Sequence, residues 1–149
     1  MPGRYCTFGV GGLLLGIDVE RVQEVLRDQD IIPVPLSDPS VLGLLNLRGQ
    51  IVTAIDARHR LGLAERTPGQ SVAHVIVRCA DEAVSLAVDV DVDVDVDVED
   101  EVVAVDEKAY ERVPDTLNPS IASLLTGIYK LDAALLLVLD TDLAVSVAA

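Results

Sequence analysis

The chain has 149 residues, half of them hydrophobic, so it can bury the core of one domain of ordinary size. Aromatic residues make up only 3%, tryptophan is absent and the net charge is -14, which argues against a surface that stacks bases or binds phosphates. The longest apolar run, Ala133 to Leu139, is far shorter than the ~20 residues of a membrane-spanning helix, so no direct membrane insertion is expected.

The N-terminal residues have the pattern of a β-hairpin. In the stretch YCTFGV the side chains of Cys6, Phe8 and Val10 share one face of a strand, because alternate residues point the same way. Gly11 and Gly12 then provide a turn into the run LLLGI. We therefore expect an antiparallel pair of strands with a buried cysteine on its inner face.

A short helix is expected directly after this hairpin. Asp18 is a suitable N-cap, and the valines that follow recur at helical spacing. The apolar positions of this helix are Val19, Val22 and either Val25 or Leu26. Its outward positions are Glu20, Arg21 and Glu24. The prolines at positions 33, 35 and 39 then confine the chain to a loop or a sheet edge, because proline cannot donate to a ladder.

Short strands continue through the rest of the chain. VLGLLNL and QIVTAID are predicted as a hairpin joined through Arg48 and Gly49, where the glycine can take a positive φ. A helical turn at ARHRLGL and a polar connector at AERTPGQ follow. The later strands are VAHVIVRC, AVSLAVD, EVVAVD, TGIYKL and ALLLVLD, with a loop near Pro114 and Pro119. The fold class is therefore mainly all-β, as two small antiparallel barrels or a sandwich.

A Val-Asp repeat occupies Val88 to Asp97 and runs on to Asp100. The surrounding segment, Cys79 to Glu107, holds 12 of the 25 acidic residues and none of the 11 basic ones. A straight strand offers few carboxylates to one ion and this tract has no glycine to curl it, which disfavours a calcium site. Because neighbouring aspartates repel each other, we expect them to point into solvent or the segment to be disordered. A cation-binding β protein that uses this tract is the alternative function.

Residues suited to catalysis are sparse. The sequence has two histidines, two cysteines and no nucleophile elbow, phosphate loop or dinucleotide fingerprint. We expect His59 and His74 to be solvated or structural and Cys6 to be buried. No catalytic, cofactor-binding or metal-binding residue is assigned, and an enzyme is the weak hypothesis. The cysteines and the absence of a basic start followed by an apolar stretch favour a reducing cytoplasm.

Glu24 and Arg48 form the remaining candidate pair. They come from different predicted elements, and apolar positions flank each of them. They could form an ordinary surface ion pair, which stabilises a fold very little. They could also stand at the rim of an apolar protein-binding groove, where arginine is enriched. Composition alone does not choose between the two.

The same residues carry a family resemblance. GIDVERVQEVL, then prolines, then GLLNLRGQIV and IDAR resemble the CheW family of bacterial chemotaxis coupling proteins, whose pattern is G-I-D/P-x-x-x-V-x-E-I, prolines and G-x-x-N-x-R-G-x-x-x-P-x-x-D-L-R. The matching positions are Gly16, Ile17, Asp18, Val22, Glu24, Pro35, Gly43, Asn46, Leu47, Arg48, Gly49, Asp56 and Arg58. The closing stretch LTGIYKLDAALLLVLD agrees as well, so the resemblance covers about Tyr5 to Val145.

The resemblance implies a single domain over residues 5–145. It would consist of two SH3-like antiparallel barrels with short helices, the first lobe over about 5–66 and the second over about 70–140. The implied function is a non-enzymatic adaptor without a cofactor, which couples chemoreceptors to the histidine kinase CheA. Its partners would be the cytoplasmic tip of a methyl-accepting chemotaxis protein and the regulatory domain of CheA, not nucleic acid. It would be cytoplasmic, associated with membrane receptor arrays through these proteins.

The resemblance also implies a site. In the family the receptor binds a groove between the lobes, and the matching positions here are Val22, Glu24, Gly43 and Arg48. Asn46 and Gly49 would shape the turn beside it. No kinase-contact residue can be assigned by motif.

The sequence departs from the family pattern at a few positions. Thr53 and Ala57 replace a proline and a leucine, and Ala133 and Ala134 stand where a glycine-containing turn is common. The larger departure is the Val-Asp tract, since the family has one such pair and this chain has five in tandem. We expect the surplus, within residues 88–100, to form a lengthened strand or protruding hairpin of the second lobe, because a two-residue repeat preserves strand alternation.

Overall fold

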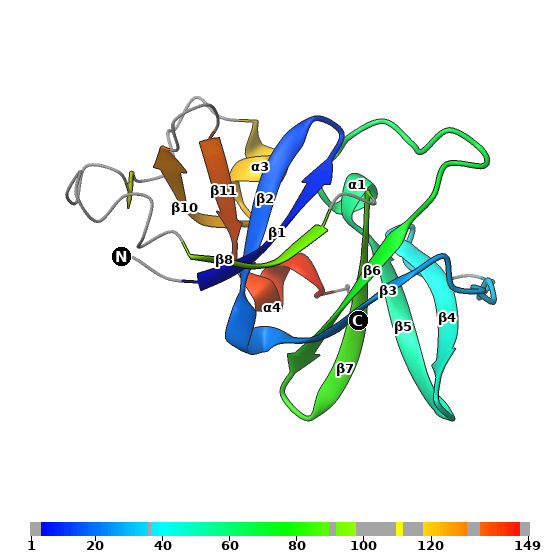
Figure 1. Cartoon of the computed structure of the whole chain (residues 1–149). Coiled ribbons are helices and arrows are strands. Elements are labelled where there is room, and N and C mark those ends of the chain that lie inside the picture. The colour runs from blue at the N-terminus through cyan, green and yellow to red at the C-terminus, as the bar shows by residue number, and fades with distance from the viewer. Residues whose placement is uncertain are drawn as a thin grey trace.

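A computed structural model describes residues 4–35, 37–89, 92–97, 110–111, 118–130 and 135–146. Its strands form two sheets, and the expected mainly all-β class with short helices is confirmed (Figure 1). Sheet A has the order β8-β1-β2-β11-β10-β9 and sheet B the order β3-β6-β7-β5-β4. Sheet A consists of β1 (Arg4–Val10), β2 (Leu13–Asp18), β8 (Val92–Asp97), β9 (Tyr110–Glu111), β10 (Leu125–Lys130) and β11 (Leu135–Leu139). Sheet B consists of β3 (Val22–Arg27), β4 (Val41–Leu47), β5 (Gln50–Asp56), β6 (Ala73–Cys79) and β7 (Glu82–Val88).

The two sheets do not follow the two expected halves of the chain. Sheet A combines the first hairpin with the C-terminal strands, through a parallel pairing of β2 with β11. Sheet B takes the middle of the chain, through a parallel pairing of β5 with β7. The strands of residues 5–66 and those of 70–140 are therefore each divided between both sheets. The chain crosses from one sheet to the other after β2 and again after β7.

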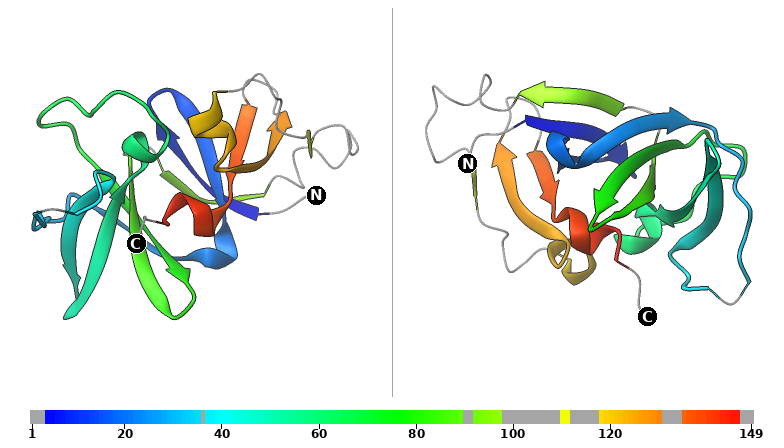
Figure 2. Two further views of the ribbon diagram at one scale, coloured as in Figure 1. Left: turned by 180° about the vertical axis from the view of Figure 1, so that it is seen from behind. Right: turned by 90° about the horizontal axis from the view of Figure 1, so that it is seen from below.

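Short helices lie at turns between strands and, in the case of α4, after the last strand. They are a 3-10 turn η1 (Val19–Arg21) and the helices α1 (Ala57–Arg60), α3 (Pro119–Ala122) and α4 (Thr141–Ala144). Asp56 caps α1 by accepting the N–H of Arg58 at 3.0 Å, as expected of a helical turn at this position. Figure 2 shows α4 lying where the two sheets approach each other. No helix in the described part of the chain is long and apolar enough to cross a membrane.

Two hydrophobic cores lie on the two faces of sheet B, because alternate residues of its central strands point in opposite directions. The larger core, here the interface core, takes side chains from both sheets and from α1 and α4. It includes Cys6, Phe8, Leu15, Val75, Leu86, Leu137 and Ala144. The smaller core, here the barrel core, contains Leu45, Leu47, Val52, Ala54, Ile76 and Ala83. The expected burial of Cys6 with Phe8 and Val10 is confirmed, as all three are fully buried.

Sheet B closes into a barrel next to its first and last strands. β3 and β4 stand at opposite edges of the sheet, yet Ile32, which follows β3, exchanges two backbone hydrogen bonds of 2.8 Å with Leu44 on β4. Gly43 permits this approach: a Cβ at this position would lie 2.2 Å from the carbonyl oxygen of Ile32. Its φ of +148° is also one that side chains disfavour. Gly43 is thus required by the closure of the barrel.

The expectation of a helix after Asp18 is wrong beyond the first turn. Asp18 caps only η1, accepting the N–H of Glu20 at 2.9 Å, and the chain then enters β3. β3 pairs with β6, and its register shifts between Val22 and Glu24, which marks a bulge. The bulge lets Val22 and Val25, three residues apart, both pack against the interface core. A spacing that resembled a helix is therefore produced by an extra residue in a strand.

The Val-Asp tract contributes the edge strand of sheet A. β8 pairs with β1 antiparallel, so Val92–Asp97 of the tract forms a strand. Residues 90–91 and 98–100 of the tract lie outside the described residues. So do the expected strand EVVAVD, Pro114 and the alanines at 133 and 134.

Candidate functional site

The hairpin between β4 and β5 presents Arg48 at its tip. Asn46 Oδ1 accepts the N–H of Gly49 at 2.7 Å, which holds the turn closed. Arg48 and Gly49 both have positive φ, at 50° and 88°. This is the geometry of a tight hairpin turn, and the expected hairpin through these two residues is confirmed. The side chain of Arg48 is 67% exposed.

Glu24 and Arg48 are joined by a two-pronged ion pair. Arg48 Nη1 donates to Glu24 Oε1 at 3.1 Å, and Nη2 donates to Oε2. The hydrogen bonds from Arg48 lower the pKa of the Glu24 carboxyl below its ordinary value, and the same bonds raise the pKa of the guanidinium. Both groups are therefore charged at neutral pH. The pair connects β3 to the tip of the β4–β5 hairpin, so it spans the line along which the barrel closes.

Val22 and Gly43, the other two expected groove residues, are packed against other parts of the fold. Val22 lies opposite Val77 of β6 and is half-buried against the interface core. Gly43 lies opposite Ala54 of β5 and is buried beneath the Ile32 backbone. The structure thus brings Glu24 and Arg48 into direct contact, whereas Val22 and Gly43 position the strands that carry them.

Ile51 is a neighbour of the site that the sequence pattern did not single out. It lies opposite Asn46 in the hairpin and is 61% exposed. Its neighbour Val52 is fully buried, so alternation places Ile51 on the outer face. The sequence could have indicated this exposed position, because Ile51 comes two residues after the turn glycine and pairs with the polar Asn46 across the hairpin. An exposed apolar side chain beside an exposed arginine is suited to contact with a protein partner.

A second set of charges, here the junction network, holds together the end of β7, the helix α1 and the β1–β2 turn. Arg58 and Asp89 form an ion pair of 3.1 Å, with side chains only 13% and 22% exposed. Arg66 lies 3.3 Å from Asp56 and 3.9 Å from Asp89. Gly11 donates its N–H to Asp89 at 3.1 Å. Asp89, the first aspartate of the repeat, is therefore turned into the fold, and the expectation that it points into solvent is wrong.

A third set of polar contacts involves Arg21, which the sequence analysis expected on an outward face. Its guanidinium donates to the carbonyl oxygen of Arg78 at 2.9 Å and to Asp142 of α4 at 2.5 Å. The hydrogen bond to Asp142 raises the pKa of Arg21, and the same bond lowers the pKa of Asp142.

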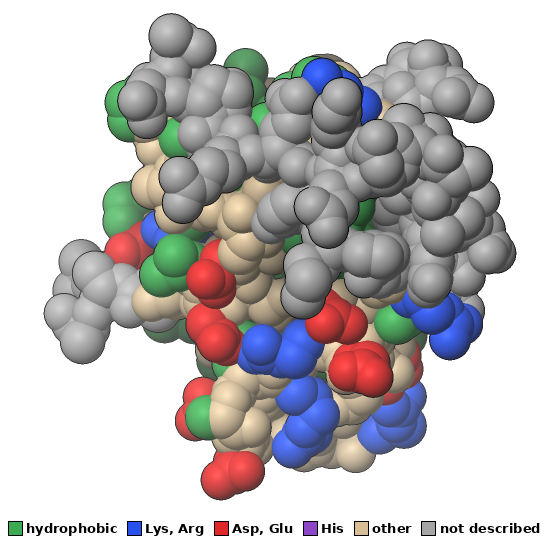
Figure 3. Space-filling view, turned by 90° about the vertical axis from the view of Figure 1, so that its left-hand side faces the viewer, with side chains coloured by type: hydrophobic (Ala, Val, Ile, Leu, Met, Phe, Trp, Pro, Cys, Tyr) green, Lys and Arg blue, Asp and Glu red, His purple; other side chains and the backbone are tan. Residues whose placement is uncertain are grey.

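On the face shown in Figure 3, described basic and acidic side chains stand side by side rather than gathering by sign. The described side chains visible there therefore form no patch of a single sign.

The groups considered for catalysis lie in structural positions. His74 is buried, with Nδ1 2.9 Å from Ser85 Oγ, and its burial and the nearby Arg66 lower its pKa. His59 is exposed. Burial raises the pKa of the Cys79 thiol, which makes it a poorer nucleophile. Among the described residues, no three His, Cys, Asp or Glu side chains are grouped to hold a metal ion.

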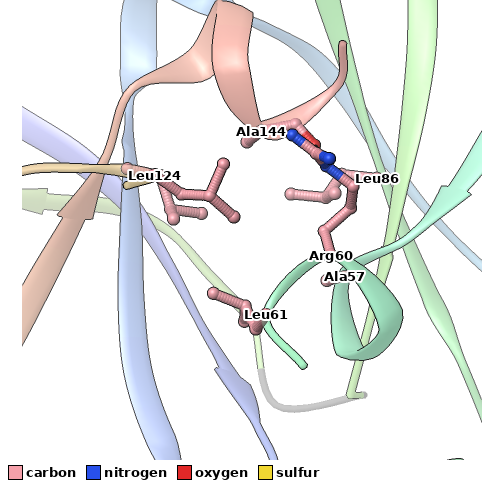
Figure 4. Close-up of a pocket in the computed structure, with 7 residues that line it drawn as sticks. Ala57, Arg60, Leu61, Leu86, Leu124 and Ala144 are labelled. Atoms are coloured by element: carbon pink, nitrogen blue, oxygen red, sulfur yellow. The ribbon is translucent and has the colours of Figure 1, made fainter. Parts of the chain in front are cut away.

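A small pocket lies between α1 and α4 (Figure 4). Its lining is apolar apart from Arg60, whose guanidinium is bound to the backbone of α4 through the carbonyl oxygen of Leu143 at 2.5 Å. The other lining residues are Ala57, Leu61, Leu86, Leu124, Leu139 and Ala144. The pocket therefore belongs to the packing between the sheets, and Arg60 ties α1 to α4 across its opening.

Comparisons with known proteins agree on one family. A family model described as CheW-like domain matches residues 4–148. The chemotaxis protein CheW of Treponema pallidum strain Nichols is 28% identical, over 90% of this chain and 76% of that protein. CheW of Bacillus subtilis strain 168 is 27% identical, over 91% and 82%. The scaffolding protein TtCheW from Thermoanaerobacter tengcongensis superimposes with a TM-score of 0.76 at 26% identity, covering 94% of this chain and 90% of that one. These relatives give no support to a cation-binding function.

Proposed function

The chain belongs to the CheW-like domain family, and we propose that it is a chemotaxis adaptor that links chemoreceptors to the histidine kinase CheA by binding both. The match over residues 4–148 carries this proposal, because it covers both sheets and every element of the candidate site. The adaptor is non-enzymatic and uses no cofactor. Its place is the cytoplasmic side of receptor arrays, where it is held by its protein partners.

The receptor-binding surface of this proposal centres on Arg48. The bidentate contact with Glu24 holds the arginine side chain in one direction, so that less freedom is lost when a partner binds. The Arg48 side chain remains 67% exposed, so its guanidinium can still donate hydrogen bonds to a partner. Ile51 supplies an apolar contact beside it. Asn46 and Gly49 set the shape of the turn, and Val22 and Gly43 act through the position of β3 and β4.

The kinase is bound by a different surface, so that both partners can be held at once. A binding assay with two partners therefore separates damage to one surface from loss of the fold. The two proteins to use are a cytoplasmic chemoreceptor fragment and the regulatory domain of CheA.

The test compares the charge reversals Arg48→Asp and Glu24→Lys with the unaltered chain. We expect each reversal to weaken capture of the receptor fragment by about tenfold or more, because each leaves a like-charged pair at the surface that the partner contacts. Binding of the CheA regulatory domain and the melting temperature should stay near those of the unaltered chain, since Arg48 is largely exposed and solvent weakens the pair. Unchanged receptor capture by both variants would refute the assignment.

A charge swap, Glu24→Arg with Arg48→Glu, serves as the matched control. It restores an internal ion pair with the charges exchanged. If Arg48 contacts the receptor directly, the swap stays defective. Recovery of receptor binding by the swap would instead mean that the pair acts only by holding β3 to the hairpin.

A further inference from the structure

The helix α4 is seated where the two sheets approach each other, although it continues from a strand of sheet A (Figure 2). Its N-cap, Asp140, donates its backbone N–H to the carbonyl oxygen of Leu124 at 2.7 Å. Of the four residues of α4, Thr141 and Ala144 are buried and the other two are exposed. A helix of one turn is not stable by itself in water, so α4 depends on the contacts that other elements make with it.

Two arginines from elements next to sheet B hold the two ends of α4. Arg21, in η1 before β3, donates to the carboxylate of Asp142 at 2.5 Å. Arg60, in α1 after β5, donates to the last carbonyl oxygens of the helix, those of Leu143 at 2.5 Å and of Ala144 at 3.4 Å. An acid in the first turn and a cation at the C-terminal end are also the charges that a helix dipole favours. α4 is therefore bound to sheet B mainly through its ends.

The apolar contact between α4 and the rest of the fold is small. Its buried residues are a threonine and an alanine, and Val145, directly after the helix, is 6% exposed. The pocket of Figure 4 lies beside Ala144 and is lined by leucines of the surrounding elements, among them Leu61 and Leu124. Segments that bury few apolar side chains open at a lower free energy than the sheets around them. The two arginines therefore contribute a large share of what holds α4 in place.

We propose that α4 is a latch between the two sheets. Arg21 and Arg60 hold it closed, and it detaches as one unit while both sheets keep their structure. The hinge is Asp140, where the chain stays bonded to Leu124. Detachment takes Ala144 away from the pocket, so it uncovers apolar side chains of the interface core without unfolding that core. The fold thus has a second state, whichever partner the Arg48 surface binds.

Cys79 is a natural reporter of this latch. Its Sγ lies 3.5 Å from Nη2 of Arg21. Burial raises the pKa of the thiol and a hydrogen bond to Asp142 raises it further, against an opposing effect of Arg21, so its alkylation is slow in the closed state. Detachment of α4 removes Asp142 and speeds the reaction. Cys6 is fully buried in the interface core and reports opening of the whole fold.

The test measures how fast iodoacetamide alkylates each cysteine of the native protein, with the two sites separated by peptide mass spectrometry. Arg60→Gln removes the contact at the end of α4 that is farther along the chain from Asp142. If α4 moves as one unit, this change is felt at Cys79. We expect alkylation of Cys79 to become about tenfold faster, because hydrogen bonds from a charged donor are lost.

Arg58→Gln is the matched control. Arg58 belongs to the same short helix α1, but it pairs with Asp89 in the junction network, which stays intact when the latch opens. This variant should speed the alkylation of Cys6 and leave that of Cys79 unchanged. If Arg58→Gln also speeds Cys79, the thiol is uncovered only when the whole fold opens. If Arg60→Gln leaves Cys79 unchanged, α4 does not move as a unit. Either result overturns the proposal.

Hydrogen exchange tests the latch in the opposite direction and needs no cysteine. Asp142→Asn weakens the contact with Arg21 in the first turn of α4. The amides to follow are those of Ala144 and Val145, which donate to backbone oxygens of Asp140 and Thr141 at 2.9 and 3.3 Å. We expect both to exchange about twofold to fivefold faster while the amides of β6 keep their protection. Unchanged exchange at Ala144 and Val145 contradicts a latch held at both ends.

Discussion

The Glu24–Arg48 pair and the junction network are both arginine–carboxylate systems, but they differ in their surroundings. In the Glu24–Arg48 pair the arginine is 67% exposed, Glu24 is 24% exposed, and each residue has its main polar contact with the other. In the junction network Arg58 and Asp89 are 13% and 22% exposed, and Asp89 also accepts a backbone N–H. Exposed pairs are weakened by solvent, whereas half-buried pairs leave an unpaired charge when broken. The same chemistry therefore serves stability at the junction and leaves Arg48 available for a partner at the surface.

Substitution of Gly43 is expected to cause the largest loss of stability. It would show that this residue of the candidate site is needed for the fold itself. Gly43→Ala would place a methyl group 2.2 Å from the Ile32 carbonyl oxygen in a backbone conformation that alanine disfavours. We expect a loss of about 3 kcal/mol or more in the free energy of unfolding, measured by urea denaturation. Loss of receptor binding in this variant would then follow from the fold and not from a lost contact.

Gly49→Ala is the control for the Gly43 prediction. Gly49 also has a positive φ, but no atom outside its neighbours lies within 4 Å of the position its Cβ would take. The Gly49→Ala variant should lose only about 1 kcal/mol of its free energy of unfolding, because alanine is merely disfavoured in this backbone conformation. Similar losses in the two variants would mean that the chain does not pass as closely over Gly43 as described.

The junction network gives the next largest effect. Asp89→Ala removes the ion partner of the largely buried Arg58 and the acceptor of the Gly11 N–H, which lies in an exposed turn. We expect a loss of about 2–3 kcal/mol in the free energy of unfolding. Glu24→Ala is the matched variant in the Glu24–Arg48 pair. It should change the melting temperature very little, because the arginine it leaves behind is 67% exposed and keeps its contact with solvent. Equal losses in the two variants would remove the distinction between the regions.

The sequence alone was sufficient for features that depend on neighbouring residues. Alternation placed Cys6 and Phe8 in the core, and the Arg48-Gly49 turn was identified by its glycine. The contact of Glu24 with Arg48 was one of two alternatives that the sequence left open, because the pair joins positions 24 residues apart. Periodicity failed at β3, since a bulge gave Val22 and Val25 the spacing of a helix.

The sequence could not indicate which charges would be buried. Within the repeat Asp89 is chemically identical to the aspartates that follow it, and only the fold brings Arg58, 31 residues away, to its carboxylate. Closure of the barrel at Ile32 and Leu44 was likewise invisible, because it depends on the curvature of a whole sheet. Long-range contacts of this kind are set by tertiary structure, whereas residue type and spacing report only local preferences.

The smallest expected effect is a pH dependence of stability caused by His74, a buried residue whose pKa is lowered in part by Arg66 of the junction network. Burial lowers the pKa of His74 below its ordinary value of 6.5, and the charge of Arg66 lowers it further, against a smaller opposing influence from Asp28. Unfolded chains thus bind a proton near pH 6.5 that the folded protein binds only at lower pH. Stability should therefore fall as the pH drops below about 6.5, by at most ~1.4 kcal/mol per pH unit, until the folded protein binds the proton as well. His74→Gln should lose this slope in urea denaturation while His59→Gln, at an exposed position, keeps it; a slope that survives in His74→Gln would assign the proton to another group.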